Sequence, residues 1–319
     1  MLYKINHTTS YDYDEGVTFC HNIAILKPKN ILGQNLVNYN LDISPAPIVF
    51  SEREDFFGNT VTRFSIQEYH KQLKVTATSK VDRNMALAPN IDFFSDAKKI
   101  TLSETLQLLK QVDPKSLEAR QFQLESVLIH TIGQEIKDYA LKSFKPNRSV
   151  FEASYELMER IFNDFEFNTT FSNVATPITD VMREKKGVCQ DFAQIAIACL
   201  RSVHLPARYI SGYIETLPPP GKEKLIGTDA SHAWFSVYIP TFGWVDFDPT
   251  NNQIPKDQHI VVAWGRDYYD VAPLKGVLYS SGLSKLSVSV DIRPEGGYPT
   301  QQNKTDTQHQ QQSQQSQQQ

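Results

Sequence analysis

Hydrophobic and polar residues alternate along the first quarter of the chain, in short runs that end at turn residues. The runs are YKINHTTSYDY, HNIAILKP, NLVNYNLDISP, TVTRFSIQEY and QLKVTATSKV, and turn signals such as Pro45 and Gly58-Asn59 separate them. Alternation of this kind is typical of strands that bury one face. The regular spacing of strands and turns predicts an all-β, sandwich-like domain over residues 1–84 rather than a parallel sheet.

The pattern changes after residues 85–99, which we interpret as a linker that contains Pro89. Apolar residues then recur at three- and four-residue intervals in three segments, which predicts amphipathic helices. These are SLEARQFQLESVLIHTIGQ (116–134), VFEASYELMERIFNDF (150–165) and CQDFAQIAIACLRSVH (189–204). Strands are predicted at 207–216, 232–239 and 243–250, with a Pro-rich loop at 218–229. Residues 100–295 are therefore assigned to a second folded domain.

The composition is that of a soluble globular protein. With 319 residues, 40% of them hydrophobic and 21% charged, the chain has enough apolar material for about two folded units. The formal net charge is -4 and no cluster of basic residues could follow a phosphate backbone, so nucleic acid is not expected as a partner.

We found no membrane or export signal in the sequence. The start, MLYKINHTTSYDYDE, lacks the apolar core of a secretory signal, and no run approaches the roughly 20 apolar residues that cross a bilayer. A cytoplasmic protein without a membrane partner is therefore expected. The glutamine-rich tail at 296–319 is predicted to be disordered, because it has almost no apolar side chain whose burial could offset the entropy of ordering it. Nothing in the composition indicates an oligomeric state.

The three cysteines, Cys20, Cys189 and Cys199, show no CxxC spacing, which argues against a disulfide framework and a structural zinc site. No metal and no cofactor are expected, since carboxylates with calcium-loop spacing are also missing from the core. Cys199 lies on the apolar stripe of its helix and is expected to be a packing residue. Cys189 differs because it follows Gly187-Val188 at the predicted start of that helix. Unpaired N–H groups there stabilise a thiolate and could stabilise an oxyanion.

A histidine and an aspartate flank the predicted hairpin that follows. His232 opens one alternating segment and Asp248 ends the next, with IPTFG between them as the turn. If the segments pair about position 240, these two side chains lie opposite each other on one face, and the carboxylate could orient the imidazole. Asp246 points to the same face, so periodicity alone does not choose between the aspartates. A buried packing cysteine beside a polar hairpin is the alternative that these residues leave open.

The core of the bacterial transglutaminase-like proteins, often described as cysteine proteases, closely resembles two segments of this chain. They are GVCQDFAQIAIACLRSVHLPARYISGY and ASHAWFSVYIPTFGWVDFDPTN. The β-rich N-terminal domain of that family resembles the segments HTTSYDY, GQNL and DFFGNTV, and the stretch after its core resembles HIVVAWGRDYYDVAPLKGV. The likeness covers most of residues 1–295.

This resemblance implies an α+β fold: a sandwich-like N-terminal domain, then a papain-like catalytic domain with helices packed on an antiparallel sheet and a C-terminal extension. It implies a catalytic triad of Cys189, His232 and Asp248 and acyl transfer through a thioester, on an amide of a peptide or protein or on a glutamine carboxamide. Two residues depart from the family pattern, Gln194 where histidine is common and His204 where glycine is common. Neither belongs to the triad, but they leave the substrate preference open.

The sequence leaves three functions open. Hydrolysis, as an amidase or protease, is favoured because water needs no dedicated acceptor pocket. A transglutaminase, in which an amine is the acceptor, is the first alternative. A catalytically silent module that binds a peptide or a protein partner is the second.

Overall fold

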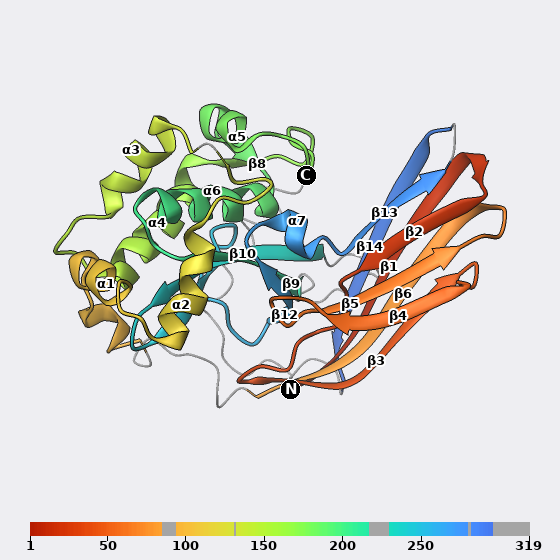
Figure 1. The fold of residues 1–319 in the computed structure, drawn as a ribbon, viewed down its shortest axis with the longest axis horizontal. Coiled ribbons are helices and arrows are strands. Elements are labelled where there is room, and N and C mark those ends of the chain that lie inside the picture. The colour runs from red at the N-terminus through yellow and green to blue at the C-terminus, as the bar shows by residue number, and fades with distance from the viewer. Residues whose placement is uncertain (85–93, 131, 217–229, 280–281, 296–319) are drawn as a thin grey trace, which may run out of the picture.

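The computed structural model of the chain describes residues 1–84, 94–130, 132–216, 230–279 and 282–295. The predicted Pro-rich loop at 218–229, the predicted tail at 296–319 and most of the predicted linker lie outside these residues. The α+β fold class predicted from the sequence is confirmed, with an antiparallel β-rich region first and a mixed helix and sheet region after it (Figure 1). Among the helices that the structure describes, none has the length and hydropathy needed to cross a membrane.

The N-terminal region is a sandwich of two four-stranded antiparallel sheets, of order β14-β1-β6-β3 and β13-β2-β5-β4. Both sheets contribute to one apolar core, in which Val17 and Phe64 are almost fully buried. Alternation of buried and exposed residues, as in β1, explains why the sequence pattern identified these strands. The strands are β1 (Leu2–Val17), β2 (Phe19–Ala24), β3 (Gln34–Ser44), β4 (Val49–Glu54), β5 (Thr60–Ile66), β6 (His70–Arg83), β13 (Leu274–Tyr279) and β14 (Ser284–Pro294).

The last two strands that the structure describes belong to this sandwich. β13 pairs with β2, with Leu274 opposite Ala24, and β14 pairs with β1, with Pro294 opposite Tyr3. The sequence predicts these residues to be an extension of the second domain, and here the structure differs. The local pattern of a strand does not specify its partner, whereas β1 and β2 would otherwise leave main-chain N–H and C=O groups unpaired at an edge. The second domain is therefore an insertion between β6 and β13.

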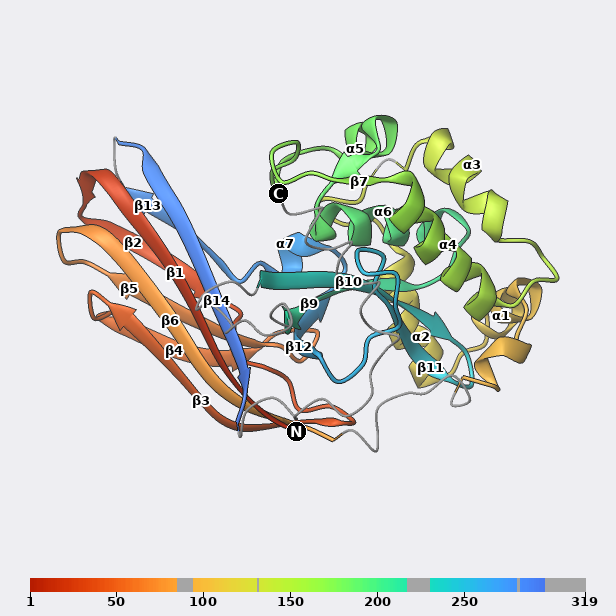
Figure 2. The same ribbon diagram turned by 180° about the vertical axis from the view of Figure 1, so that it is seen from behind.

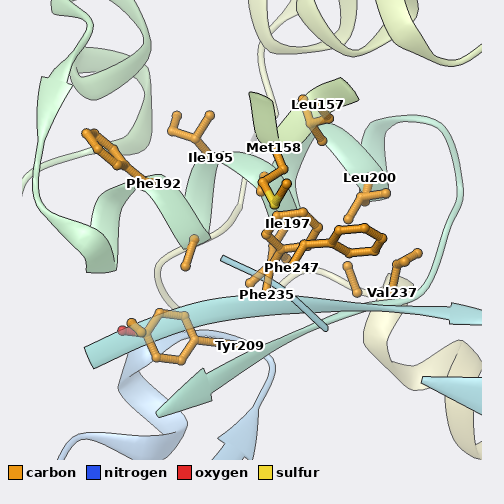
Figure 3. Close-up of a cluster of buried hydrophobic side chains, with 14 of the residues drawn as sticks. Leu157, Met158, Phe192, Ile195, Ile197, Leu200, Tyr209, Phe235, Val237 and Phe247 are labelled. Carbon is orange, nitrogen blue, oxygen red and sulfur yellow. The ribbon is translucent and has the colours of Figure 1, made fainter. Parts of the chain in front are cut away.

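Helix α6 (Cys189–Ser202) runs through the second domain and is buried on nearly all sides. Ile197 and Leu200 pack against Phe235, Val237 and Phe247 of the underlying sheet (Figure 3). Each fully buried side chain of this size contributes about 1.5–3 kcal/mol, so this layer fixes the helix relative to the strands. The sheet is antiparallel, has the order β11-β10-β9-β12, and consists of β9 (Ala207–Ile214), β10 (Ala230–Ile239), β11 (Gly243–Phe247) and β12 (His259–Gly265).

Three other helices pack around α6. Helices α3, α4 and α5 all contact α6, and α4 also contacts β10 and β11; Figures 1 and 2 show α3 and α5 on the opposite side of α6 from β10. The remaining elements are α1 (Leu102–Leu108), α2 (Pro114–Arg120), α3 (Gln134–Ser143), α4 (Val150–Asp164), α5 (Ile178–Glu184), α7 (Tyr268–Val271), the 3-10 turns η2 (Ala97–Lys99) and η3 (Gln121–Gln123), and the short parallel pair β7 (Glu166–Phe167) and β8 (Lys186–Gly187).

The predicted helices at 150–165 and 189–204 are confirmed as α4 and α6, but the one predicted at 116–134 is not continuous. Helix α2 ends at Arg120 and α3 begins at Gln134. The segment between these two helices is bound by the guanidinium of Arg201. Arg201 Nε donates to Phe122 O at 2.8 Å, and Arg201 Nη1 donates to Ser126 Oγ at 3.0 Å. A tertiary contact from a distant helix thus overrides the local apolar pattern.

Two side-chain amides of the N-terminal sandwich bind the outer edge of β12. Gln34 Nε2 donates to Val261 O at 2.7 Å, and Gln34 Oε1 accepts from Val261 N at 2.9 Å. Asn59 forms the same pair with Trp264, at 2.8 Å to its O and 3.1 Å from its N. β12 is an edge strand, so each amide replaces one residue of a neighbouring strand and ties the two domains together.

Replacing Gln34 with alanine is expected to lower the free energy of unfolding by roughly 2 kcal/mol, because the buried N–H of Val261 loses its acceptor and the C=O of Val261 keeps only the hydrogen bond from Lys29 N at 3.2 Å. Denaturant titration measures this change. Gln107→Ala, at an exposed position of α1, is the matched control and should change the stability by less than about 0.5 kcal/mol. Equal small effects of the two substitutions would contradict the coupling of the domains through this amide.

Candidate active site

Cys189 lies where the chain changes from extended to helical backbone. Val188, the N-cap residue of α6, has φ -118° and ψ 179°, and Cys189 is the first helical residue. The first N–H groups of a helix have no intrahelical acceptor and give this end a partial positive charge. The side chain of Cys189 is partly exposed, whereas Cys20 and Cys199 are buried. Cys189 is therefore the thiol that combines access with nearby unpaired donors.

Asp191 holds this helix start in place. Its Oδ2 accepts a hydrogen bond from Val188 N at 2.8 Å and another from the hydroxyl of Ser172. Its carboxyl group also packs against Gly187, where an added Cβ atom would lie 2.7 Å from Asp191 Oδ2. The segment before Cys189 thus needs a glycine because the carboxylate that fixes the helix start occupies the space of a side chain.

The β10–β11 hairpin turns where predicted, but its register differs from the prediction. Phe235 lies opposite Phe247, so the pairing is displaced by two residues from a direct alignment of His232 with Asp248. A displacement of two keeps every side chain on its predicted face because the period of a strand is two. His232 reaches Asp248 diagonally, with its Nε2 atom 2.7 Å from Oδ2.

Asp246, the other aspartate that periodicity allowed, has a different partner. Its Oδ2 accepts a hydrogen bond from Trp234 Nε1 at 3.0 Å. The indole of Trp234 lies over Gly212, where an added Cβ atom would come within 2.6 Å of the ring. The ring centroid of Trp234 is 5.8 Å from that of His232, so the indole forms one wall beside the imidazole.

The carboxylate of Asp248 is fully buried and accepts five hydrogen bonds. Its Oδ1 accepts from the backbone N–H groups of Thr250 at 3.0 Å and Asn251 at 3.3 Å, as in an Asx-turn. Its Oδ2 accepts from His232, from Asn251 Nδ2 at 2.7 Å and from His259 Nε2 at 3.0 Å. The loop that supplies these donors is closed by backbone hydrogen bonds between Asp248 and Gln253.

These contacts set the charges of the site. Burial alone would raise the pKa of Asp248, but the charge of His232 and the hydrogen bonds from His232 and His259 hold it well below its usual range. Burial lowers the pKa of His232, yet the charge and hydrogen bond of Asp248 outweigh burial and raise it. A hydrogen bond and a charge interaction with Cys189 raise it further. The favoured state is an imidazolium between a carboxylate and a sulfur atom.

The structure therefore brings the three predicted site residues together. Asp248 holds Nε2 of the His232 ring, which leaves Nδ1 for the sulfur of Cys189, and Cys189 is within hydrogen-bonding reach of this ring. The other two cysteines do not share in this arrangement: Cys199 donates to the backbone oxygen of Ile136, and Cys20 lies in the core of the sandwich.

His259 and Asn251 contact Asp248 as well, and the sequence analysis did not select them. His259 Nδ1 lies 3.4 Å from the backbone N–H of Lys256, an orientation that leaves Nε2–H to donate to Asp248. Burial lowers the pKa of His259, which keeps this ring neutral. The signal in the sequence was the position of His259 directly before the apolar run IVVA, at the start of an edge strand.

His232, Asp248 and His259 are also metal-ligand types, and their donor atoms lie within 4.8 Å of one another. The two imidazole Nε2 atoms are each within hydrogen-bonding distance of the same carboxylate oxygen, and Asn251 Nδ2 is 3.2 Å from His232 Nε2. A zinc ion would need Nε2 lone pairs about 2.0–2.1 Å away instead of N–H donors. The arrangement fits a hydrogen-bonded network.

Two family models match the chain. Residues 3–82 match the bacterial transglutaminase-like N-terminal region, and residues 137–249 match the transglutaminase-like superfamily. An uncharacterized protein of Mycobacterium tuberculosis is 39% identical over 300 residues, which are 92% of each chain. An uncharacterized protein of Mycobacterium leprae is 31% identical over 294 residues, 91% of this chain and 97% of its own.

Two more distant matches extend the comparison. The protein-glutamine gamma-glutamyltransferase of Pseudomonas aeruginosa is 30% identical over 132 residues, 39% of this chain and 20% of that protein. A crystal structure from Cytophaga hutchinsonii, provisionally assigned as a cysteine protease, has a TM-score of 0.71 at 21% identity and covers 96% of this chain and 95% of its own. This last likeness concerns the fold. By its sequence, the chain belongs to the transglutaminase-like superfamily, a family of thiol-dependent acyl transfer, and carries the bacterial N-terminal region of that superfamily.

Proposed function

We propose that this protein is an enzyme that transfers the acyl group of an amide through a thioester, with Cys189 as nucleophile, His232 as acid and base, and Asp248 as the group that orients His232. One observation carries the proposal. A partly exposed thiol at a helix start lies within reach of an imidazole whose far nitrogen is held by a buried carboxylate at 2.7 Å. A packing cysteine needs neither the exposure nor the imidazole.

The first half of the reaction forms the thioester. The thiolate of Cys189, stabilised by the imidazolium and by the helix start, attacks the carbonyl carbon of the amide. The carbonyl oxygen takes up the electron pair, and the backbone N–H of Cys189 is a donor for this oxyanion. The oxyanion then collapses, the C–N bond breaks, and His232 gives its proton to the leaving amine or ammonia.

The second half regenerates the enzyme. His232, now neutral, removes a proton from the acceptor as the acceptor attacks the thioester carbonyl. The C–S bond breaks and the sulfur leaves as a thiolate paired with the new imidazolium. Asp248 binds Nε2 throughout, which keeps Nδ1 directed at the sulfur.

Hydrolysis of a peptide or protein amide is the reaction that we favour, because water requires no acceptor pocket. A specific observation supports a second candidate, transfer of a glutamine acyl group to an amine. The core of the chain matches a protein-glutamine gamma-glutamyltransferase, and this match covers 39% of the chain.

We assign His259 a positioning role in this reaction. Its Nε2–H donates from β12 to Asp248 Oδ2, the same oxygen that His232 contacts from β10. A donor to an ionised acceptor contributes about 1.5–3 kcal/mol. His259 therefore helps to keep Asp248 ionised and in the place from which it orients His232.

Iodoacetamide at neutral pH is expected to label Cys189 rapidly in the native protein and to leave the other two thiols nearly unlabelled. Burial raises the pKa of Cys199 to about 12 and also raises that of Cys20. His232→Gln removes the positive charge beside the sulfur, so labelling of Cys189 should slow by roughly tenfold or more. Peptide mass spectrometry measures each rate. Equal, slow labelling of all three cysteines would support a silent binding module instead.

A glutamine-containing peptide, incubated with and without a primary amine, is expected to yield a product in the presence of the native protein. Deamidation, cleavage and amine incorporation each give a distinct mass, so mass spectrometry separates hydrolysis from transfer. Cys189→Ala should abolish all three products, while Cys199→Ala, at a buried thiol away from the site, should retain them. Product formation by Cys189→Ala would exclude this residue as the nucleophile.

His259→Leu is expected to lower kcat by roughly tenfold or more with little change in KM, because Asp248 loses a donor that acts through His232. His259→Gln, which restores an N–H donor, should recover part of the activity. His130→Leu, at an exposed histidine, is the control. Full turnover by the leucine variant, or equal losses in both His259 variants with lowered thermal stability, would reject the positioning role.

A further inference from the structure

A cavity of about 640 Å³ lies on the face of the second-domain sheet that is turned away from α6. Its walls come from β9 to β12, from α2 and from the segment before β3, and Figure 2 shows α2 beside β11. All three tryptophans of the chain, Trp234, Trp244 and Trp264, line it. Cys189 and His232 do not belong to its lining, but His259 and Trp234 do, so the cavity adjoins the network around Asp248. A cavity of this size holds a small organic molecule or the end of a peptide.

Arg208 of β9 lines this cavity and has no hydrogen-bond acceptor among the residues that the structure describes. Its guanidinium group lies between two indole rings, 4.4 Å from the centroid of Trp244 and 4.2 Å from that of Trp264. Its Nε atom is completely buried. Donor groups are normally paired, so a guanidinium group in a cavity wall with no acceptor among the described residues indicates a ligand that supplies one.

The neighbouring charges do not satisfy Arg208. Asp246 accepts from Trp234 Nε1 and forms no ion pair with Arg208 within 4.0 Å in the described structure. Burial lowers the pKa of Arg208 to about 10, and the charges of Asp246 and Glu118 oppose that effect only in part. The group is therefore still positively charged at neutral pH. By contrast Arg83, which also lines the cavity, donates to Lys256 O at 3.0 Å.

We propose that this cavity binds a monocarboxylate with a flat apolar body, with Arg208 as the partner of the carboxylate. A guanidinium group matches a carboxylate with two parallel hydrogen bonds. The lining contains three cationic side chains (Arg83, Lys115, Arg208) and two anionic ones (Glu118, Asp246), an excess of one positive charge that suits a single negative charge. The indole rings provide the surface for the apolar body.

Phenylacetate and phenylacetamide are the probes, because they differ in the carboxylate alone. The tryptophans line the cavity, so their fluorescence reports occupancy, and calorimetry gives the affinity. We expect phenylacetate to bind saturably and at least roughly tenfold more tightly than phenylacetamide. Cys189→Ala should bind it equally well, so this test is independent of the proposed enzyme activity. Equal binding of acid and amide, or no saturable binding of either, would overturn the proposal.

Two kinds of variant locate the site. Arg208→Lys keeps the charge but loses the paired donors, and should weaken phenylacetate binding by roughly tenfold. Lys115→Glu changes an exposed charge at the rim without touching the indole stack, and should weaken it several-fold even if Arg208 variants fail to fold. Lys110→Glu, exposed and outside the lining, is the matched control. Unchanged binding in Arg208→Lys and in Lys115→Glu would refute the assignment.

A short peptide that ends in phenylalanine distinguishes a peptide C-terminus from a small free acid as the natural ligand. The peptide is tested with a free C-terminal carboxylate and with a C-terminal amide. Tighter binding of the peptide acid than of phenylacetate identifies a peptide end as the ligand. Weaker binding identifies a small free acid. Preference for the amidated peptide would contradict recognition of a carboxylate.

Discussion

The buried carboxylate of Asp248 is the constraint on which the arrangement of the site depends. An ionised group away from water costs several kcal/mol unless it is hydrogen-bonded and paired. Here the donors come from separate elements: His232 from β10, His259 from β12, and Asn251 and Thr250 from the loop after β11. The hydrogen bonds that satisfy the Asp248 carboxylate also fix the imidazole of His232 beside Cys189, and the carboxylate raises the pKa of that imidazole. The stability of the loop and the chemistry of the thiol therefore have the same cause.

The N-terminal sandwich supports this network from a distance. His259 lies at the start of β12, and the outer edge of β12 is bound by the amides of Gln34 and Asn59. The chain leaves β12 and returns to the sandwich as β13 and β14, which pair with β2 and β1. Both connections hold the strand that places a donor on Asp248. In this account the sandwich is part of the architecture of the site.

Local patterns predicted the parts of the molecule that local physics determines. The alternation of the sandwich strands, the buried helix that begins at Cys189 and the hairpin between His232 and Asp248 all follow from the periodicity of side chains. Because side chains alternate along a strand with a period of two, His232 and Asp248 share the predicted face even though the register is displaced by two residues. The resemblance of the motifs then selected Asp248 over Asp246, a choice that periodicity left open.

The features that the sequence analysis missed depend on contacts between distant segments. The guanidinium of Arg201 interrupts the helix expected at 116–134, and nothing in the local apolar pattern reveals a hydrogen bond from residue 201. A local pattern likewise does not reveal that β14 pairs with β1 or that His259 donates a hydrogen bond to Asp248. His204, at a position where glycine is common in the family, has φ 62°, so the left-handed backbone explains the glycine there.

The protonation state of His232 tests the central claim most directly. Ring-nitrogen chemical shifts, measured by NMR at neutral pH in the native protein and in Cys189→Ala, distinguish an imidazolium from either neutral tautomer. We predict an imidazolium at His232, a shift of its titration to lower pH when Cys189 is replaced, and a neutral ring with a proton on Nε2 at His259. A His232 ring that titrates near its ordinary value of about 6.5 and does not respond to the loss of the sulfur would contradict it.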